Sequence, residues 1–209
     1  MNYLLKIVLL FLIFIASPSF SGDAIDIKKA KYFSILSLPP IPIDNSNKFQ
    51  FDYDAINLGK ELFFDPGLSE TKKVSCATCH VTKGEFVPNE SMAAGKLRSF
   101  RSSMQIEGAG YNTFFFWDGR ADSLWAQALE PLENPMEHNF PRFKAVLYVL
   151  NNYRPAIELL SKKDSVLNAH FNTLNQARLS NTIELEENSL SVDYIFSLIG
   201  KAIASFLSN

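Results

Sequence analysis

The feature that most constrains this 209-residue chain is a run of five residues, Cys76-Ala77-Thr78-Cys79-His80. The two cysteines are the only ones in the chain, and the histidine follows the second of them directly. The C-x-x-C-H spacing is typical of c-type haem attachment, in which both thiols add to the vinyl groups of one porphyrin and the histidine binds the iron. The pattern therefore predicts one covalently bound haem c, with Cys76, Cys79 and His80 as its attachment residues and His80 as the metal ligand.

Three other interpretations explain less of this motif. A structural disulfide accounts for the two cysteines but not for the histidine that follows them. A thioredoxin-like redox pair requires a neighbouring βαβ pattern, which the sequence lacks, and a zinc site requires two more ligands at suitable spacing. The aromatic run Phe114–Trp117 would suit the apolar faces of a porphyrin, although most of the 18 phenylalanines are expected to form ordinary core.

The N-terminus has the features of a secretory signal peptide. Lys6 precedes an apolar run from Ile7 to Ala16, and small residues stand at a plausible cleavage point after Ser21. Because the run is shorter than the roughly 20 apolar residues that span a bilayer, we expect cleavage after Ser21 rather than a membrane anchor. Residues 1–21 are therefore predicted to be a signal peptide, and export from a bacterium would place the mature protein in the periplasm.

The overall charge excludes one large class of partners. The chain has 20 Lys and Arg residues against 22 Asp and Glu residues, which gives a formal net charge of -2. Nucleic-acid binding requires a broad positive field, so no nucleic-acid partner is expected. The hydrophobic share of 47% is that of a globular protein with enough apolar surface for one well-buried domain or two small ones.

Proline and polar residues set the N-terminal part of the chain apart. Residues 22–47 contain Pro39, Pro40 and Pro42, and we expect them to form an extended arm on the surface. A single domain is expected over residues 48–209. Within it, residues 81–111 are rich in Gly, Ser, Lys, Arg and Asn and lack periodicity, which predicts a long irregular loop of the kind that wraps a ligand.

Helical periodicity predominates in this domain, and no segment has a convincing strand pattern. The clearest helix is C-terminal, where apolar residues recur at helical spacing over residues 192–206 behind Ser191 as a candidate cap. Asp122 or Ser123 is placed to cap another helix, which ends near Pro131. The fold class is therefore predicted to be mainly α, with further helices expected over residues 54–63, 143–151 and 154–161.

Six segments, one of which contains the haem motif, occur in a distinctive order. They are Leu58–Pro66, Leu68-Ser69, Val74–His80, Phe116–Leu124, Gln127–Glu137 and Gly200–Phe206. Together they resemble the bacterial dihaem cytochrome c peroxidase and MauG family, over a region that runs from residue 38 to the C-terminus. The resemblance implies a cytochrome c-like haem domain with long irregular loops. It further implies reduction of hydrogen peroxide to water, with electrons from a small donor cytochrome or cupredoxin.

The resemblance implies roles for three more residues. Glu137 takes the place of a distal glutamate that assists cleavage of the peroxide O–O bond, with Gln127 beside it. A carboxylate in an apolar pocket suits this task, because burial raises its pKa and lets it carry a proton between the two oxygens. Trp117 takes the family's position between two haems, where we expect electron transfer. From its own chemistry, Arg120 is expected to pair with Asp118 or with a haem propionate.

The sequence departs from the family in three respects. It has one C-x-x-C-H motif rather than two, so we expect an N-terminal haem domain without the second haem domain. The alternatives are a truncated chain, an enzyme split so that a separate chain supplies the second haem, and a specialised single domain. Ser102 stands where the family has an asparagine of its calcium site, which argues against calcium binding. No histidine follows the motif before Glu137. The distal side of the iron is therefore expected to be open or held by Met92, Lys96, Met104 or His138.

The other histidines leave alternatives open. We expect His138 to be exposed beside Glu137, and we expect His170, in a polar stretch without a clear pattern, to lie on the surface. Met136 offers a different axial ligand, which makes a monohaem c-type electron-transfer protein without peroxidase turnover the main alternative function. An inactive fragment of a dihaem peroxidase is the third.

Overall fold

A computed structural model of the protein describes residues 27–34, 37–80, 103–179 and 189–209. The chain divides between Pro40 and Ile41 into two units. The predicted signal peptide over residues 1–21 lies outside the described residues, as does most of the predicted long loop.

The first unit corrects the expectation of a wholly extended arm. It contains the short helix α2 (Ile27–Ala30) and the 3-10 turn η1 (Lys31–Phe33). Lys28 and Lys29 lie in the last turn of α2, where positive charge is favourable next to the carbonyl end of a helix. The last residues of the expected arm belong to the second unit, in which Asn47 is buried and donates a 3.0 Å hydrogen bond to the carbonyl of Lys201.

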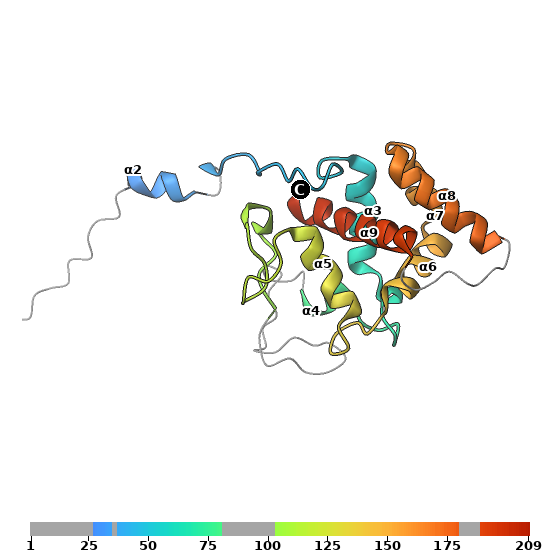
Figure 1. The fold of residues 1–209 in the computed structure, drawn as a ribbon. Helices are drawn as coiled ribbons and strands as arrows, with labels where there is room; N and C mark the ends of the chain where they lie inside the picture. Colours follow the sequence, from blue (N-terminus) through green and yellow to red (C-terminus); the bar gives the residue numbers. More distant parts are fainter. Residues whose placement is uncertain (1–26, 35–36, 81–102, 180–188) are drawn as a thin grey trace, which may run out of the picture. The chain divides into compact units, whose positions relative to one another are not determined.

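The second unit is helical, which confirms the predicted mainly α fold class (Figure 1). Among its described residues, the only pairing of β type is an isolated bridge between Phe115 and Ala121. Its helical elements, in chain order, are α3 (Tyr53–Phe64), η3 (Pro66–Leu68), α4 (Cys76–Cys79), η4 (Ala109–Tyr111), α5 (Leu124–Glu133), α6 (Arg142–Asn152), α7 (Arg154–Ser161), α8 (Ser165–Leu179) and α9 (Leu190–Ser208).

The C-terminal helix α9 is the centre of this unit. It packs against α3, α5, α6 and α8, and Figure 1 shows it running between α3 and α5. The closest approach to α3 is at Gly59, where an added Cβ would lie 1.9 Å from the carbonyl oxygen of Ala202. By length and composition α9 is the one described helix that could cross a bilayer, but 61% of that stretch is buried in the structure, as in a core helix.

Two of the predicted helix ends need correction. Ser123 caps α5 by accepting from the amide of Ala126, as one of the two predicted candidates, but α5 continues past Pro131 to Glu133. A proline fits the helical φ and removes only one N–H donor, so the last turn survives it. At α9 the capping side chain is that of Ser189, which accepts from the amide of Val192, whereas Ser191 lies inside the first turn.

Helix α8 was not expected from the sequence. Its buried residues Leu167, Phe171 and Leu174 recur at helical spacing, and α8 packs on α7 and α9. His170 on this helix is therefore half-buried rather than a plain surface residue. Its ring stacks on that of Tyr194 with 4.0 Å between centroids, and its Nδ1 lies 3.0 Å from Oγ of Ser191.

Candidate haem-binding site

The C-x-x-C-H motif forms a single helical turn, α4, with its histidine at the C-terminal end. Oγ1 of Thr78 accepts a 2.9 Å hydrogen bond from the amide of Ser75, and the amide of His80 donates to the carbonyl of Cys76 at 2.9 Å. No disulfide joins Cys76 and Cys79. Burial, together with the neighbouring Cys79, raises the pKa of the Cys76 thiol to about 12, so this sulfur is protonated near neutrality.

All seven predicted site residues line one cavity of about 300 Å³. Its walls come from α3, α4, α5, α9, the segment that precedes α5 and the turn that follows it. The predicted residues are Cys76, Cys79, His80, Trp117, Arg120, Gln127 and Glu137. The structure therefore brings together side chains that are up to 61 residues apart in the chain.

The chemistry of this cavity fits a haem c. Phe63, Phe115, Leu124, Ile203 and Leu207 supply apolar wall next to the two thiols and the imidazole. Within the described part of the chain, no group of three or more His, Cys, Asp or Glu residues could hold a metal ion by itself. An iron at this site would therefore be held by a porphyrin, with a histidine as its protein ligand.

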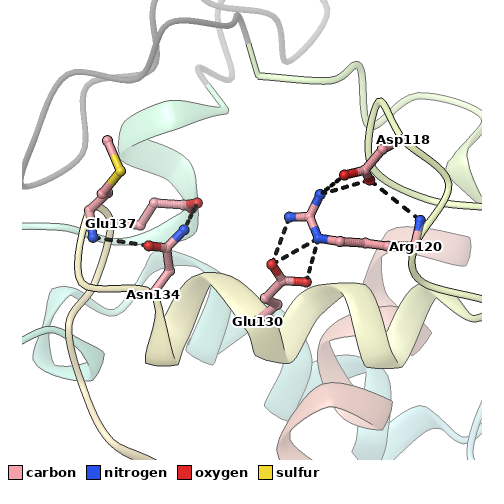
Figure 2. Close-up of polar contacts among 6 residues, drawn as sticks. Asp118, Arg120, Glu130, Asn134 and Glu137 are labelled. Atoms are coloured by element: carbon pink, nitrogen blue, oxygen red, sulfur yellow. Dashed lines mark hydrogen bonds and ion pairs between the residues drawn. The ribbon is translucent and has the colours of Figure 1, made fainter.

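Glu137 is half-buried in the turn after α5 and is held by Asn134 (Figure 2). Nδ2 of Asn134 donates a 2.8 Å hydrogen bond to Oε1 of Glu137, and its Oδ1 accepts from the amide of Met136 at 3.0 Å. Burial raises the pKa of Glu137 above its usual value, although the Asn134 hydrogen bond opposes this. The nearby charges of Glu130 and Arg120 act in opposite directions.

Gln127 lies on the face of α5 that borders the cavity. The cavity-lining residues Gln127, Pro131 and Asn134 are spaced four and three residues apart, which places them on one side of the helix. Gln127 therefore lies one helical turn from Pro131 and two from Asn134, which holds Glu137. Gln127 and Glu137 both line this cavity, and their predicted roles stay predictions.

Arg120 is bound by two carboxylates (Figure 2). Its Nη1 donates to Asp118 at 2.8 Å, as expected, while Nε and Nη2 donate to Glu130 at 3.0 and 2.6 Å. The guanidinium also stacks over the ring of Phe116, 3.6 Å from its centroid. Sequence reasoning missed Glu130, because nothing local links a loop arginine with a helical residue ten positions later. Binding of a propionate by Arg120 stays a prediction.

Trp117 lies at the tip of a tight turn. The amide of Phe115 donates to the carbonyl of Ala121 at 2.9 Å, which closes the turn. Phe116 at φ 64° and Gly119 at φ 71° both have left-handed backbone conformations, which are costly for a bulky residue such as phenylalanine. This turn leaves Trp117 63% exposed while it still borders the cavity.

The expectation that His138 is exposed was wrong. The side chain is only 4% exposed, and its Nδ1 lies 2.7 Å from the carbonyl oxygen of Leu68. The turn after α5 folds it inward, an effect of tertiary packing that leaves no local signal. Of the four candidate distal ligands, His138 and Met104 line the cavity, whereas Met92 and Lys96 lie outside the described residues.

Two other expectations concern ligands of this region. Met136, the alternative axial ligand, is 38% exposed and is not among the lining residues of the cavity. Ser102, on which the argument against calcium depends, lies outside the described residues.

Comparison with known proteins identifies the family. A sequence model described as "Di-haem cytochrome c peroxidase" matches residues 53–208. The chain therefore belongs to the di-haem cytochrome c peroxidase family, which is a family of c-type haem proteins.

Individual relatives match over shorter stretches. "Methylamine utilization protein MauG" of Methylorubrum extorquens is 42% identical over 88 residues, which cover 41% of this chain and 25% of MauG. "Cytochrome c551 peroxidase" of Pseudomonas aeruginosa has the same identity over the same length and the same two coverages. The matched region thus spans a quarter of these two relatives.

Solved structures share the fold. The crystal structure of a MauG-like protein associated with microbial copper homeostasis has a TM-score of 0.61 and 20% identity. The match covers 82% of this chain and 44% of that one. The diheme peroxidase BthA from Burkholderia thailandensis has a TM-score of 0.54 and 22% identity, over 80% of this chain and 41% of BthA. At these identities the likeness establishes the fold alone.

Proposed function

We propose that this chain is a periplasmic c-type haem peroxidase domain that reduces hydrogen peroxide to water. The observation that carries the proposal is the position of Glu137, a half-buried carboxyl with a raised pKa that borders the same cavity as Cys76, Cys79 and His80. Membership of the di-haem cytochrome c peroxidase family supports the same reaction. Each peroxide takes up two electrons and two protons and yields two waters.

The haem-attachment motif would hold the cofactor. Cys76 and Cys79 would form thioether bonds to one haem, and His80 would bind its iron. When bound there, the haem supplies the redox centre that passes electrons to the peroxide. The apolar residues Phe63, Phe115 and Leu124 in the cavity wall exclude water from this centre.

Glu137 would move the proton. Because burial raises its pKa, the carboxyl can accept a proton from one peroxide oxygen and return it to the other near neutral pH. Asn134 holds Oε1 of Glu137 at 2.8 Å and so fixes the plane of the carboxyl group. The amide of Gln127, which borders the same cavity, would orient the peroxide by a hydrogen bond.

Electrons would enter from a partner protein. We infer a small donor cytochrome or cupredoxin, or a second haem domain on another chain, with Trp117 as the side chain nearest the partner. The 63% exposure of this tryptophan and its position at the rim of the cavity support that role. Location in the periplasm follows from the predicted signal peptide over residues 1–21.

The test is peroxide turnover by the haem-loaded chain, compared with the Glu137→Gln variant. We expect a decrease of about 10²- to 10⁴-fold in the turnover rate, the range that general acid–base groups contribute. Glu61→Gln, a change at an exposed position in α3, is the matched control and should keep the full rate. Equal rates for Glu137→Gln and the unmodified protein would remove Glu137 from the mechanism and the proposal with it.

A further inference from the structure

His138 is a buried histidine to which the proposed reaction assigns no role. It follows Glu137 directly, is 4% exposed and borders the same cavity. We propose that His138 is a second positioning residue of Glu137, beside Asn134, because it ties the turn that carries this carboxyl to the segment that leads into the haem-attachment motif. This inference rests on the proposed function of Glu137.

The turn that carries Glu137 is anchored to the C-terminal end of α5 by backbone hydrogen bonds and by the side chain of Asn134. The amide of Glu137 donates to the carbonyl of Asn134 at 3.0 Å, and the amide of His138 donates to that of Pro131 at 3.2 Å. The amide of Phe140 donates to Leu132 at 2.8 Å. These bonds fix the turn to the end of one helix, but they do not set its distance from α4.

A cluster of hydrogen bonds joins the same turn to residues 68–70. Nδ1 of His138 donates to the carbonyl of Leu68 at 2.7 Å, and the carbonyl of His138 accepts from the amide of Glu70 at 3.0 Å. Nδ2 of Asn139 donates to Oε2 of Glu70 at 2.6 Å. His138 therefore uses both its side chain and its main chain to hold one segment, and only the side-chain bond depends on the residue being histidine.

Residues 68–70 are in turn linked to the two thiols of the haem-attachment motif. Leu68 and Ser69 are almost fully buried, and Oγ of Ser69 accepts a 3.2 Å hydrogen bond from the amide of Val74. Val74 precedes Ser75, the residue before α4. A continuous path of buried hydrogen bonds and main chain thus runs from Glu137 through His138 to Cys76. Hydrogen bonds in such a low-dielectric setting are strong and directional, which suits a positioning role.

The protonation of His138 is set by its partner. A carbonyl oxygen can only accept, so Nδ1 carries the proton and Nε2 of the neutral ring does not. Burial lowers the pKa of His138, although the Leu68 hydrogen bond opposes this, and the ring is therefore neutral at pH 7. A neutral donor holds the turn without placing a positive charge next to Glu137.

The experiment compares two substitutions in the haem-loaded chain. His138→Leu keeps the volume but removes the N–H donor, whereas His138→Asn keeps an amide nitrogen close to the place of Nδ1. Displacing a reacting group by about 1 Å can cost about 10²-fold in rate. We expect a loss of this size for the leucine variant and recovery to within a few-fold of the unmodified rate for the asparagine variant.

A second measurement separates positioning from loss of structure. Cyanide binds as a neutral acid and leaves its proton on a nearby base, so its association rate with the ferric protein reports on the placement of Glu137 without turnover. This rate should fall with His138→Leu and recover with His138→Asn. If the leucine variant does not fold, Asn139→Gly takes its place. Glycine suits the φ of 50° at that position, and the substitution removes the hydrogen bond to Glu70. Peroxide turnover and cyanide association should both slow, but by less than the loss expected for His138→Leu.

The outcomes are distinguishable. Unchanged rates in His138→Leu, with Glu137→Gln impaired, would overturn this inference and leave the proposed function standing. Equal impairment of the leucine and asparagine variants would overturn it too, since the donor bond would not matter. A change of ferric spin state in both variants would make His138 an iron ligand and refute the positioning role. Full activity of Glu137→Gln would instead reject the proposed function itself.

Discussion

Oε1 of Glu137 accepts a 2.8 Å hydrogen bond from Nδ2 of Asn134, the C-cap residue of α5. Oδ1 of Asn134 accepts a hydrogen bond from the backbone amide of Met136. The side-chain amide of Asn134 therefore holds both the carboxyl of Glu137 and the backbone of the turn. Figure 2 shows this pair next to the C-terminal end of α5, the helix that carries Glu130, the partner of Arg120. A single helix end thereby positions the carboxyl and places two opposing charges close to it, which together with burial set its proton affinity.

Removal of Asn134 should shift the pH dependence of the reaction. The Asn134 hydrogen bond lowers the pKa of Glu137 against the effect of burial, so Asn134→Ala should raise that pKa further. A carboxylate that must be deprotonated to accept a proton then becomes active only at higher pH. The acid limb of the plot of turnover rate against pH should move to higher pH. Asn152→Ala, which removes a 2.8 Å amide bond on the distant helix α6, should leave that limb in place.

The buried His138 makes a pH-dependent contribution to stability. Because its pKa is lowered in the folded protein, the unfolded chain binds a proton more readily, and stability is lost as the pH falls through about 6.5, the usual histidine value. The unfolding free energy of His138→Leu should be lower than that of the unmodified chain by about 1–3 kcal/mol at pH 7.5. That difference should shrink at pH 5.5 in urea titrations. Leu159→Ala removes no titrating group, so its unfolding free energy should differ from that of the unmodified chain by the same amount at both pH values.

The contact between α3 and α9 has no room for a side chain at Gly59. An alanine there would place its Cβ 1.9 Å from the backbone oxygen of Ala202, and neither backbone can move without shifting a core helix. We expect Gly59→Ala to lower the unfolding free energy by about 3 kcal/mol. Lys60→Ala, at the next and exposed position, should stay within about 0.5 kcal/mol. Similar midpoints for the two variants in thermal or urea unfolding would contradict the close approach.

Trp117 should matter for electron entry and not for stability. Since the side chain is 63% exposed, Trp117→Phe should change the unfolding free energy by no more than about 0.5 kcal/mol. Turnover limited by a donor cytochrome should slow, while turnover with a small diffusible reductant should stay unchanged. A variant that is equally slow with both reductants would place Trp117 in the chemistry of the cavity instead of in the electron path.

Local sequence patterns predicted much of the fold. The helices expected over residues 143–151 and 154–161 are present as α6 and α7, within a residue at each end, because their apolar residues recur at helical spacing. Ser123 was one of two predicted caps of α5. The same reasoning missed α8, where Leu167, Phe171 and Leu174 recur at helical spacing but stand among many polar residues, and the burial of this face comes from packing against α7 and α9.

The sequence by itself determined the haem-attachment motif, the helical class and the residues of the candidate site, because each depends on residue types at short spacing or on family resemblance. Only the tertiary structure decided which of these side chains meet. The burial of His138 against Leu68 joins positions 70 residues apart, and the pairing of Arg120 with Glu130 joins a loop with a helix. Such contacts arise when separate elements pack together, so no local spacing records them.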